Sequence, residues 1–188
     1  AIILFFSFHI SAQAQDAELQ SKLDIFNSKI QQTERGERLR WMDSLTTTIY
    51  DNSVINNPKF KYDSIARQTI KYAIGLDSIG KAAEHVANLI WYNNYVIKIP
   101  KEGILLFNTY IDDFRTIENY HTLARLYLYT ADSYKATGDA NKPLECYIKV
   151  KEYSQKSGND NYLALSNQFI GLEESNLGKF SEASISYK

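Results

Sequence analysis

Apolar residues recur at helical spacing along most of the chain, and the clearest case runs from Tyr127 to Gly158. Within it, Tyr127, Ala131 and Tyr134 lie four and three residues apart, so they share one face of a helix. Gly138 then interrupts the pattern with a residue that tolerates a positive φ angle, and the apolar spacing resumes beyond it. This stretch predicts two antiparallel helices joined by a tight turn.

The same spacing predicts helices elsewhere in the chain. The first of them carries an apolar stripe formed by Leu19, Leu23, Phe26 and Ile30. The predicted helices cover residues 16–32, 34–50, 62–76, 82–97, 101–115, 118–137 and 161–177, and a last one begins at Phe180. Residues 51–59, DNSVINNPK, are rich in Asn and contain a proline, which predicts a loop. The predicted fold class is all-α.

The predicted hairpin repeats when the chain is shifted by 40 residues. Gly138 then aligns with Gly178, and Tyr147 aligns with Phe107 in one direction and with Tyr187 in the other. A fixed period of this size is typical of stacked repeat architectures. One hairpin is too small to bury its own apolar face, so each is expected to pack on the next, with Tyr and Phe rings filling the layers between them.

These residues resemble the tetratricopeptide repeat (TPR) family over roughly residues 82 to 188. The family's helix A pattern, W-x2-[LI]-G-x2-Y, appears as Tyr127-x2-Thr130-Ala131-x2-Tyr134. Its helix B pattern, A-x3-F, appears as Pro143-x3-Tyr147 and Ala183-x3-Tyr187, preceded by Gly103-x3-Phe107. The resemblance implies a right-handed superhelical solenoid of antiparallel helix hairpins. Small residues such as Ala131 and Gly171 are expected where the two helices of a hairpin cross.

The N-terminal residues 1–14, AIILFFSFHISAQA, combine an apolar run with a small-x-small site. This combination is typical of the apolar region and cleavage site of a secretory signal peptide. The run is about half of the ~20 residues needed to span a bilayer. A buried N-terminal helix is the alternative. No Cys follows the run, so a lipoprotein anchor is not expected, and the mature chain would begin near Gln15 or Asp16 and be exported.

The predicted organisation is a signal peptide remnant at residues 1–14, N-terminal helices at 15–60, and TPR-like repeats at 61–188. The sequence stops within a predicted helix, and a solenoid normally ends in a polar capping helix. The natural protein is therefore expected to continue beyond Lys188, and membrane anchoring is expected only through such a further segment.

Composition restricts the classes of function. The net charge is −1, with 23% charged residues, which gives no electrostatic reason to expect a nucleic acid or an anionic membrane as partner. The single cysteine, Cys146, excludes an intrachain disulfide and a Cys-based zinc site. It has no nearby His or helix N-terminus to depress its pKa, so it is expected to be inert.

No catalytic or cofactor-binding motif stands out. His85 and His121 have no partner at i+4 suited to a metal pair, so they are expected to be ordinary surface or inter-repeat residues. The adjacent carboxylates Asp112-Asp113 and Glu173-Glu174 point about 100° apart on a helix, so each pair is expected to lie on a solvated face. Phosphate-loop, G-x-S-x-G and H-E-x-x-H motifs do not occur, so no enzyme activity, metal or cofactor is expected in this segment.

The resemblance also implies a partner-binding groove. In TPR proteins the concave surface is lined by helix A residues that do not pack within the hairpin. The positions implied here are His85, Asn88, Tyr92, Tyr95, Arg125, Leu128, Asp132, Lys135, Gln168 and Leu172. Such a mixed polar and aromatic lining suits a protein or peptide partner. The alternative is that these residues are the solvated side of a scaffold.

The predicted function is a non-catalytic interaction scaffold. An export signal followed by a repeat array resembles the extracytoplasmic region of regulators in Bacteroidetes-type bacteria, in which a membrane helix and a histidine kinase or helix-turn-helix output domain follow the repeats. The alternative is a freestanding periplasmic TPR adaptor in envelope assembly, which predicts no membrane span downstream. A glycan-binding outer-membrane lipoprotein is less favoured, because the lipid-bearing Cys is absent.

Overall fold

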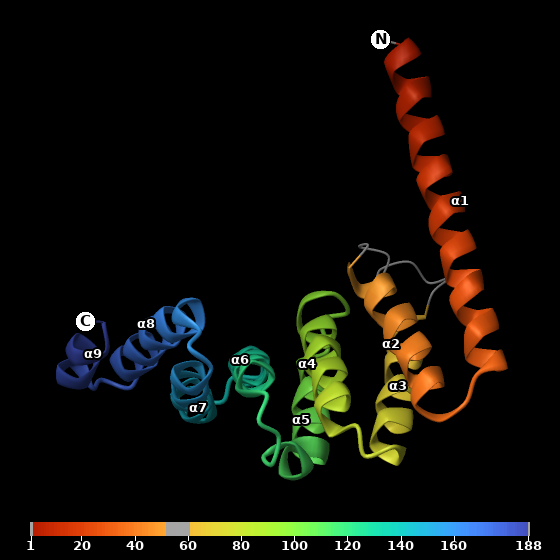
Figure 1. Ribbon diagram of the computed structural model, residues 1–188. Coiled ribbons are helices and arrows are strands. Elements are labelled where there is room, and N and C mark those ends of the chain that lie inside the picture. Colours follow the sequence, from red (N-terminus) through yellow and green to blue (C-terminus); the bar gives the residue numbers. More distant parts are fainter. Residues whose placement is uncertain (1, 52–60, 188) are drawn as a thin grey trace. The chain divides into compact units, whose positions relative to one another are not determined.

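The computed structural model describes the backbone of residues 2–51 and 61–187, and the side chains of residues 17–51 and 61–187. All regular secondary structure in these ranges is α-helical, so the predicted all-α class is confirmed (Figure 1). The predicted loop at 51–59 lies outside the described residues, apart from Asp51, which ends a helix. The chain divides into two compact units, Ala1–Tyr62 and Asp63–Lys188.

The first unit contains α1 (Ile2–Gln32) and α2 (Arg35–Asp51), which pack against each other. The ring centroids of Phe26 and Trp41 lie 5.9 Å apart. Among the described side chains of the two helices, the buried apolar residues are Leu23, Phe26, Leu39, Leu45 and Ile49. None of the helices in the described part of the chain is long and apolar enough to cross a membrane.

The second unit is a succession of helices. They are α3 (Tyr62–Gly75), which starts at the boundary, α4 (Ile79–Tyr95), α5 (Pro100–Phe114), α6 (Tyr120–Ala136), α7 (Lys142–Ser157), α8 (Asp160–Asn176) and α9 (Phe180–Ser186). The observed bounds lie close to the predicted ones, except that α4 begins three residues before the predicted Ala82. A positive φ of 55° at Asp77 turns the chain, and the Ser78 carbonyl already accepts a helical hydrogen bond from the amide of Ala82 (3.1 Å).

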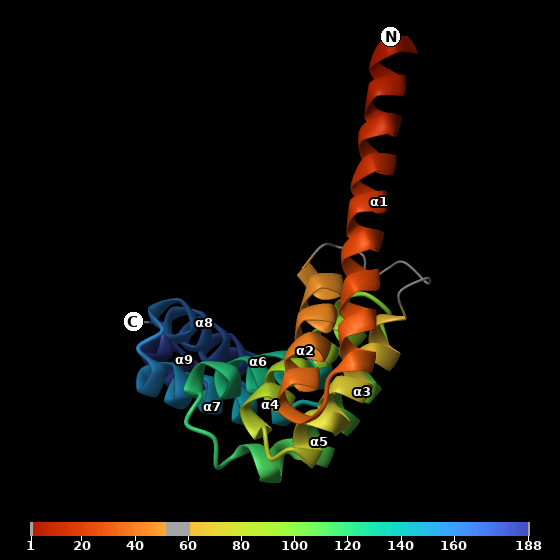
Figure 2. The same ribbon diagram turned by 45° about the vertical axis from the view of Figure 1, so that its right-hand side comes forward.

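Neighbouring helices of this unit pack in a repeat-like pattern. α4 contacts α5 and α6, α5 contacts α6, and α6 to α9 contact one another in chain order (Figure 2). Aromatic ring pairs lie between neighbouring helices. The ring centroids of Phe107 in α5 and Tyr127 in α6 lie 5.0 Å apart, and those of Tyr147 in α7 and Phe169 in α8 lie 4.9 Å apart. The missing side chain of Gly171 lets the ring of Tyr187 approach α8 closely, because a Cβ built at Gly171 would lie 2.9 Å from that ring.

The 40-residue register is visible in the backbone. Lys98, Gly138 and Gly178 all have positive φ angles, of 58°, 81° and 75°. At the N-terminus of α6, the side chain of Asn119 caps the helix by accepting from the Thr122 amide (3.1 Å). Asn159, 40 residues later, caps α8 in the same way through the amide of Tyr162 (3.0 Å). The alignment of Gly138 with Gly178 is therefore confirmed in three dimensions.

This register predicts that Lys98→Gly stabilises the protein. A left-handed conformation costs a non-glycine residue roughly 1–2 kcal/mol, and glycine's greater freedom in the unfolded chain offsets part of the gain. The free energy of unfolding should rise by about 0.5–1 kcal/mol, measured by urea denaturation. Lys71→Gly, within α3, is the matched control and should lower it by about 1 kcal/mol. A loss of stability in both variants would contradict the prediction.

Candidate partner-binding surface

The structure divides the predicted groove residues into two groups. His85, Tyr92 and Leu128 are buried, with exposed fractions of 1%, 9% and 6%. Their side chains are not available to a partner, which corrects the expectation for these three positions. The physical reason is that α4 packs directly on both α5 and α6, so part of the face assigned to the groove is an interface between helices.

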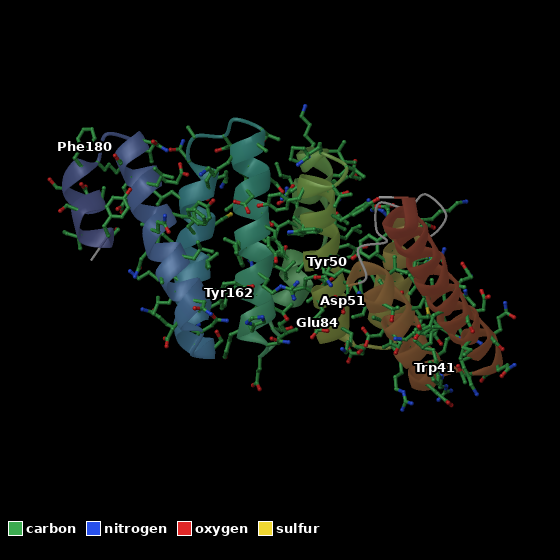
Figure 3. The ribbon with its side chains drawn as sticks, turned by 90° about the horizontal axis from the view of Figure 1, so that it is seen from above. Trp41, Tyr50, Asp51, Glu84, Tyr162 and Phe180 are labelled. Carbon is green, nitrogen blue, oxygen red and sulfur yellow. The ribbon has the colours of Figure 1, made fainter. Side chains whose placement is uncertain are left out.

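The remaining predicted residues lie on what we call the first-helix face, the surface formed by α4, α6 and α8. They are Asn88, Tyr95, Arg125, Asp132, Lys135, Gln168 and Leu172. Figure 3 labels Glu84 on α4 and Tyr162 on α8, two of the helices that form this face. Most of its polar side chains are paired between helices rather than free, so their positions are fixed before any partner arrives.

Two of these pairs join α4 to α6. The guanidinium of Arg125 donates to the Asn88 side-chain oxygen, and the hydroxyl of Tyr95 donates to Asp132 Oδ2 at 2.5 Å. A third pair joins α6 to α8, where Lys135 Nζ lies 2.9 Å from Glu173 Oε1. Pairs of this kind hold the first helices in register along the face.

Glu173 was expected on a solvated face, and this expectation is wrong. Its side chain is only 8% exposed, because α8 turns it toward α6 and Lys135 covers it. The Lys135 ammonium also lies 5.6 Å from the centre of the Phe169 ring, within cation–π range. Asp112 and Asp113, the other adjacent pair, are both exposed as predicted.

Asp132 of the first-helix face accepts hydrogen bonds from two tyrosine hydroxyls. Besides Tyr95, it accepts a hydrogen bond from the hydroxyl of Tyr147, a fully buried residue of α7 (3.1 Å). Burial raises the pKa of the Asp132 carboxyl, and the two hydroxyl donors and Lys135 offset this effect only in part. Two hydroxyl donors therefore hold the Asp132 carboxyl group in a position where burial disfavours its charged form.

The raised pKa predicts how stability depends on pH. Since the folded state binds the Asp132 proton more tightly than the unfolded state, stability falls as pH rises from the ordinary value of about 3.9 through the raised pKa. Asp132→Asn removes this titration. The difference in unfolding free energy, wild type minus variant, should decrease between about pH 3 and pH 7, by at most about 1.4 kcal/mol per pH unit. An increase would show that the hydroxyl donors outweigh burial.

Aromatic residues outside the predicted set also reach this face. Arg125 lies over the ring of Tyr129 at 5.8 Å, and the rings of His121 and Tyr162 stack at 5.3 Å. The amide of Asn159 contacts His121 Nδ1 at 3.1 Å. Burial and the nearby Arg125 charge lower the pKa of His121, which favours its neutral form. The face thus combines ring surfaces with fixed hydrogen-bonding groups.

A sequence signal for these contacts exists. The Asn88–Arg125 and Tyr95–Asp132 pairs are separated by 37 residues, and the His121–Asn159 contact by 38. Complementary side chains 37 or 38 residues apart, slightly less than the 40-residue repeat, therefore indicate contacts from α4 to α6 or from α6 to the start of α8.

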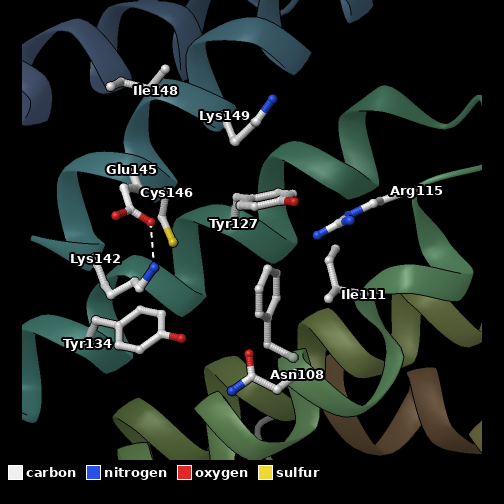
Figure 4. Close-up of a pocket in the computed structure, with 11 residues that line it drawn as sticks. Asn108, Ile111, Arg115, Tyr127, Tyr134, Lys142, Glu145, Cys146, Ile148 and Lys149 are labelled. Carbon is white, nitrogen blue, oxygen red and sulfur yellow. Dashed lines mark hydrogen bonds and ion pairs between the residues drawn. The ribbon is translucent and has the colours of Figure 1, made fainter.

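A pocket of about 500 Å³ lies between α5, α6 and α7, away from the predicted groove (Figure 4). Its lining includes Phe107 and Tyr127, which were expected only as packing residues, and Cys146. Burial raises the pKa of the Cys146 thiol to about 12, so the thiol stays protonated at neutral pH, as its predicted inertness requires. The pocket was not predicted because its lining comes from three helices, whose mutual packing the sequence pattern does not give.

Within the described residues, no group of three or more His, Cys, Asp or Glu side chains is arranged to hold a metal ion. Comparison with known proteins gives no match, either to a protein family or to a curated sequence.

Proposed function

We propose that the chain is a non-catalytic scaffold of the TPR kind, a right-handed superhelical solenoid that binds a protein or peptide on its concave side. The observation that carries the proposal is the first-helix face, where Tyr95, Tyr129 and Tyr162 lie among hydrogen-bonded polar residues. Aromatic rings with fixed polar neighbours provide contact area and directional hydrogen bonds at little cost in conformational entropy. The regular 40-residue register of turns and caps supports the solenoid.

Peptide selection tests this function. A random peptide library displayed on phage is panned on the purified chain, and the affinity of the selected peptides is measured by fluorescence anisotropy. Tyr95→Ala and Leu172→Ala, both on exposed residues of the first-helix face, should weaken binding about tenfold or more. Thr109→Ala and Asp113→Ala, on exposed positions of α5, are the matched controls. If no peptide is enriched, the function is wrong; if the face variants bind normally, the assigned face is wrong.

We further propose that this scaffold is exported, as the sensor or interaction region of a bacterial signal-transduction protein. The support is the apolar run of residues 1–10 and the small residues that follow it. Residues 1–30, supplied with an initiator Met and two lysines and fused to leaderless alkaline phosphatase, should give active enzyme in the periplasm, and Phe5→Arg with Phe6→Arg should abolish the activity. The reading frame beyond Lys188 separates a regulator, with a membrane helix and an output domain, from a freestanding adaptor.

A further inference from the structure

The pocket between α5, α6 and α7 has the size of a binding site. Its volume of about 500 Å³ lies within the range of about 300–1,000 Å³ typical of ligand pockets. We call it the α5–α7 pocket. It is separate from the first-helix face, because it is lined by side chains of the second helices α5 and α7 together with α6.

The floor of the α5–α7 pocket is apolar and aromatic. Phe107, Tyr127 and Cys146 are each less than 10% exposed. The two rings meet edge to face, with centroids 5.0 Å apart and an interplanar angle of 75°. Such a floor favours an apolar or aromatic side chain, because the aromatic edges and the thiol present no charge to it.

The rim is cationic. Four charged side chains line the pocket, and three of them, Arg115, Lys142 and Lys149, are cations against the single carboxylate of Glu145. The three cationic side chains are 60%, 49% and 47% exposed, so the mouth is open to solvent. Only Lys142 is paired with a carboxylate of the pocket itself, Glu145, at 2.6 Å (Figure 4).

The other two cations are available to a ligand. Arg115 pairs with Asp112 (3.1 Å) and Lys149 with Glu152 (2.7 Å), and neither carboxylate lines the pocket. Exposed pairs between residues three apart on a helix contribute only about 0–1 kcal/mol, so an incoming carboxylate can replace them. The Arg115 side chain also points toward the hydroxyl end of Tyr127 (Figure 4).

We propose that the α5–α7 pocket binds a partner peptide through a large apolar side chain that lies next to a carboxylate. The apolar side chain fills the floor, and the carboxylate pairs with Arg115 and Lys149. A peptide suits this pocket, because the open mouth admits one side chain while the rest of the peptide stays in solvent. The proposal rests on the proposed function for the class of partner, and it adds a second surface, with its own specificity, to the first-helix face.

Four short fluorescein-labelled peptides with the same glycine–serine flanks test this specificity by fluorescence anisotropy on the full chain. Their central pairs are phenylalanine–glutamate, phenylalanine–glutamine, serine–glutamate and phenylalanine–lysine. The first should bind about tenfold more tightly than each of the others. Equal binding of all four, or no binding of the first peptide up to about 1 mM, overturns the proposal.

Matched variants locate the site. Asn108 and Thr109 are adjacent exposed residues of α5, but only Asn108 lines the pocket. Asn108→Trp should therefore weaken binding of the phenylalanine–glutamate peptide about tenfold, and Thr109→Trp should not. Arg115→Gln should weaken it similarly, whereas Lys101→Gln, also exposed on α5, should leave it unchanged. Unchanged binding in both pocket variants overturns the proposal.

An independent readout distinguishes this proposal from the proposed function. The methyl NMR signals of Ile111 and Ile148, which line the pocket, should shift on addition of the peptide, while those of Ile65 in α3 should not. Loss of binding in Tyr95→Ala but not in Asn108→Trp would place the peptide on the first-helix face, so the pocket proposal would fail while the proposed function stood. Dimerisation abolished by Asn108→Trp would make a second copy the occupant and overturn the peptide assignment.

Discussion

Tyr147→Ala is expected to lower the free energy of unfolding by about 3–5 kcal/mol. The side chain is fully buried and is among the largest buried side chains of the described residues. It packs against the ring of Phe169 at 4.9 Å and donates a hydrogen bond to Asp132 at 3.1 Å. The substitution therefore leaves a cavity between α7 and α8 and removes a donor from a partly buried carboxylate. Urea denaturation followed by circular dichroism measures the loss.

Two further variants separate these contributions. Tyr147→Phe keeps the ring and removes only the hydroxyl, so it should cost about 1–1.5 kcal/mol. Ile148→Ala, at the neighbouring position, truncates a side chain that is 50% exposed and should cost less than about 0.5 kcal/mol. If Tyr147→Ala were no more destabilising than Ile148→Ala, the packing of α7 against α8 described here would be wrong.

The helices and their register could be predicted from the sequence because both depend on local rules. Helical spacing of apolar residues follows from the 3.6-residue turn. The turn at Gly138 follows from glycine's tolerance of positive φ, and the resulting alignment with Gly178 is seen in the structure. Lys98 has the same conformation at the first position of the series, although no glycine marks it. The left-handed conformation at Lys98 was therefore not predicted, because no glycine stands at that position.

The exposed residues of the candidate surface were harder to predict, because exposure depends on how each helix packs against helices from other parts of the chain. His85, Tyr92 and Leu128 share the helical phase of groove residues, yet contacts between α4 and its neighbours bury them. Glu173 is a carboxylate and was expected in solvent, but Lys135 from another helix makes its burial tolerable. Distances between helices decide both cases, and a helical period contains no information about those distances.

Gly103→Val is expected to lower the free energy of unfolding by about 2–3 kcal/mol. Gly103 is a buried residue of α5 where a helix former would ordinarily be favoured. A Cβ built on it would lie 2.7 Å from Ser133 Oγ and 3.2 Å from both Asn94 Oδ1 and Ile90 Cγ2. Three side chains from α4 and α6 would have to move together, and Ser133 is fully buried.

The matched control is Gly80→Val, since Gly80 also lies in a helix, α4. Outside its own helical turn, no atom lies within 4 Å of a Cβ built at Gly80, so valine meets no neighbour there. It should be neutral or raise stability by a few tenths of a kcal/mol, since valine has the better helix propensity. Similar effects at both positions would show that α5 does not approach α4 and α6 closely at Gly103.

The consequences of Gly103→Val should extend to the first-helix face. Ser133 Oγ donates to Asn94 Oδ1 at 2.7 Å, and Asn94 Nδ2 donates to the Tyr129 carbonyl at 2.7 Å, so these bonds join α4 to α6. Displacing Ser133 should weaken this junction. Asn94 and Ser133 directly precede and follow Tyr95 and Asp132 in the chain, so the Tyr95–Asp132 hydrogen bond should weaken with it. Peptides selected on the first-helix face should therefore bind Gly103→Val more weakly under conditions in which the variant is still folded, whereas Gly80→Val should bind them normally.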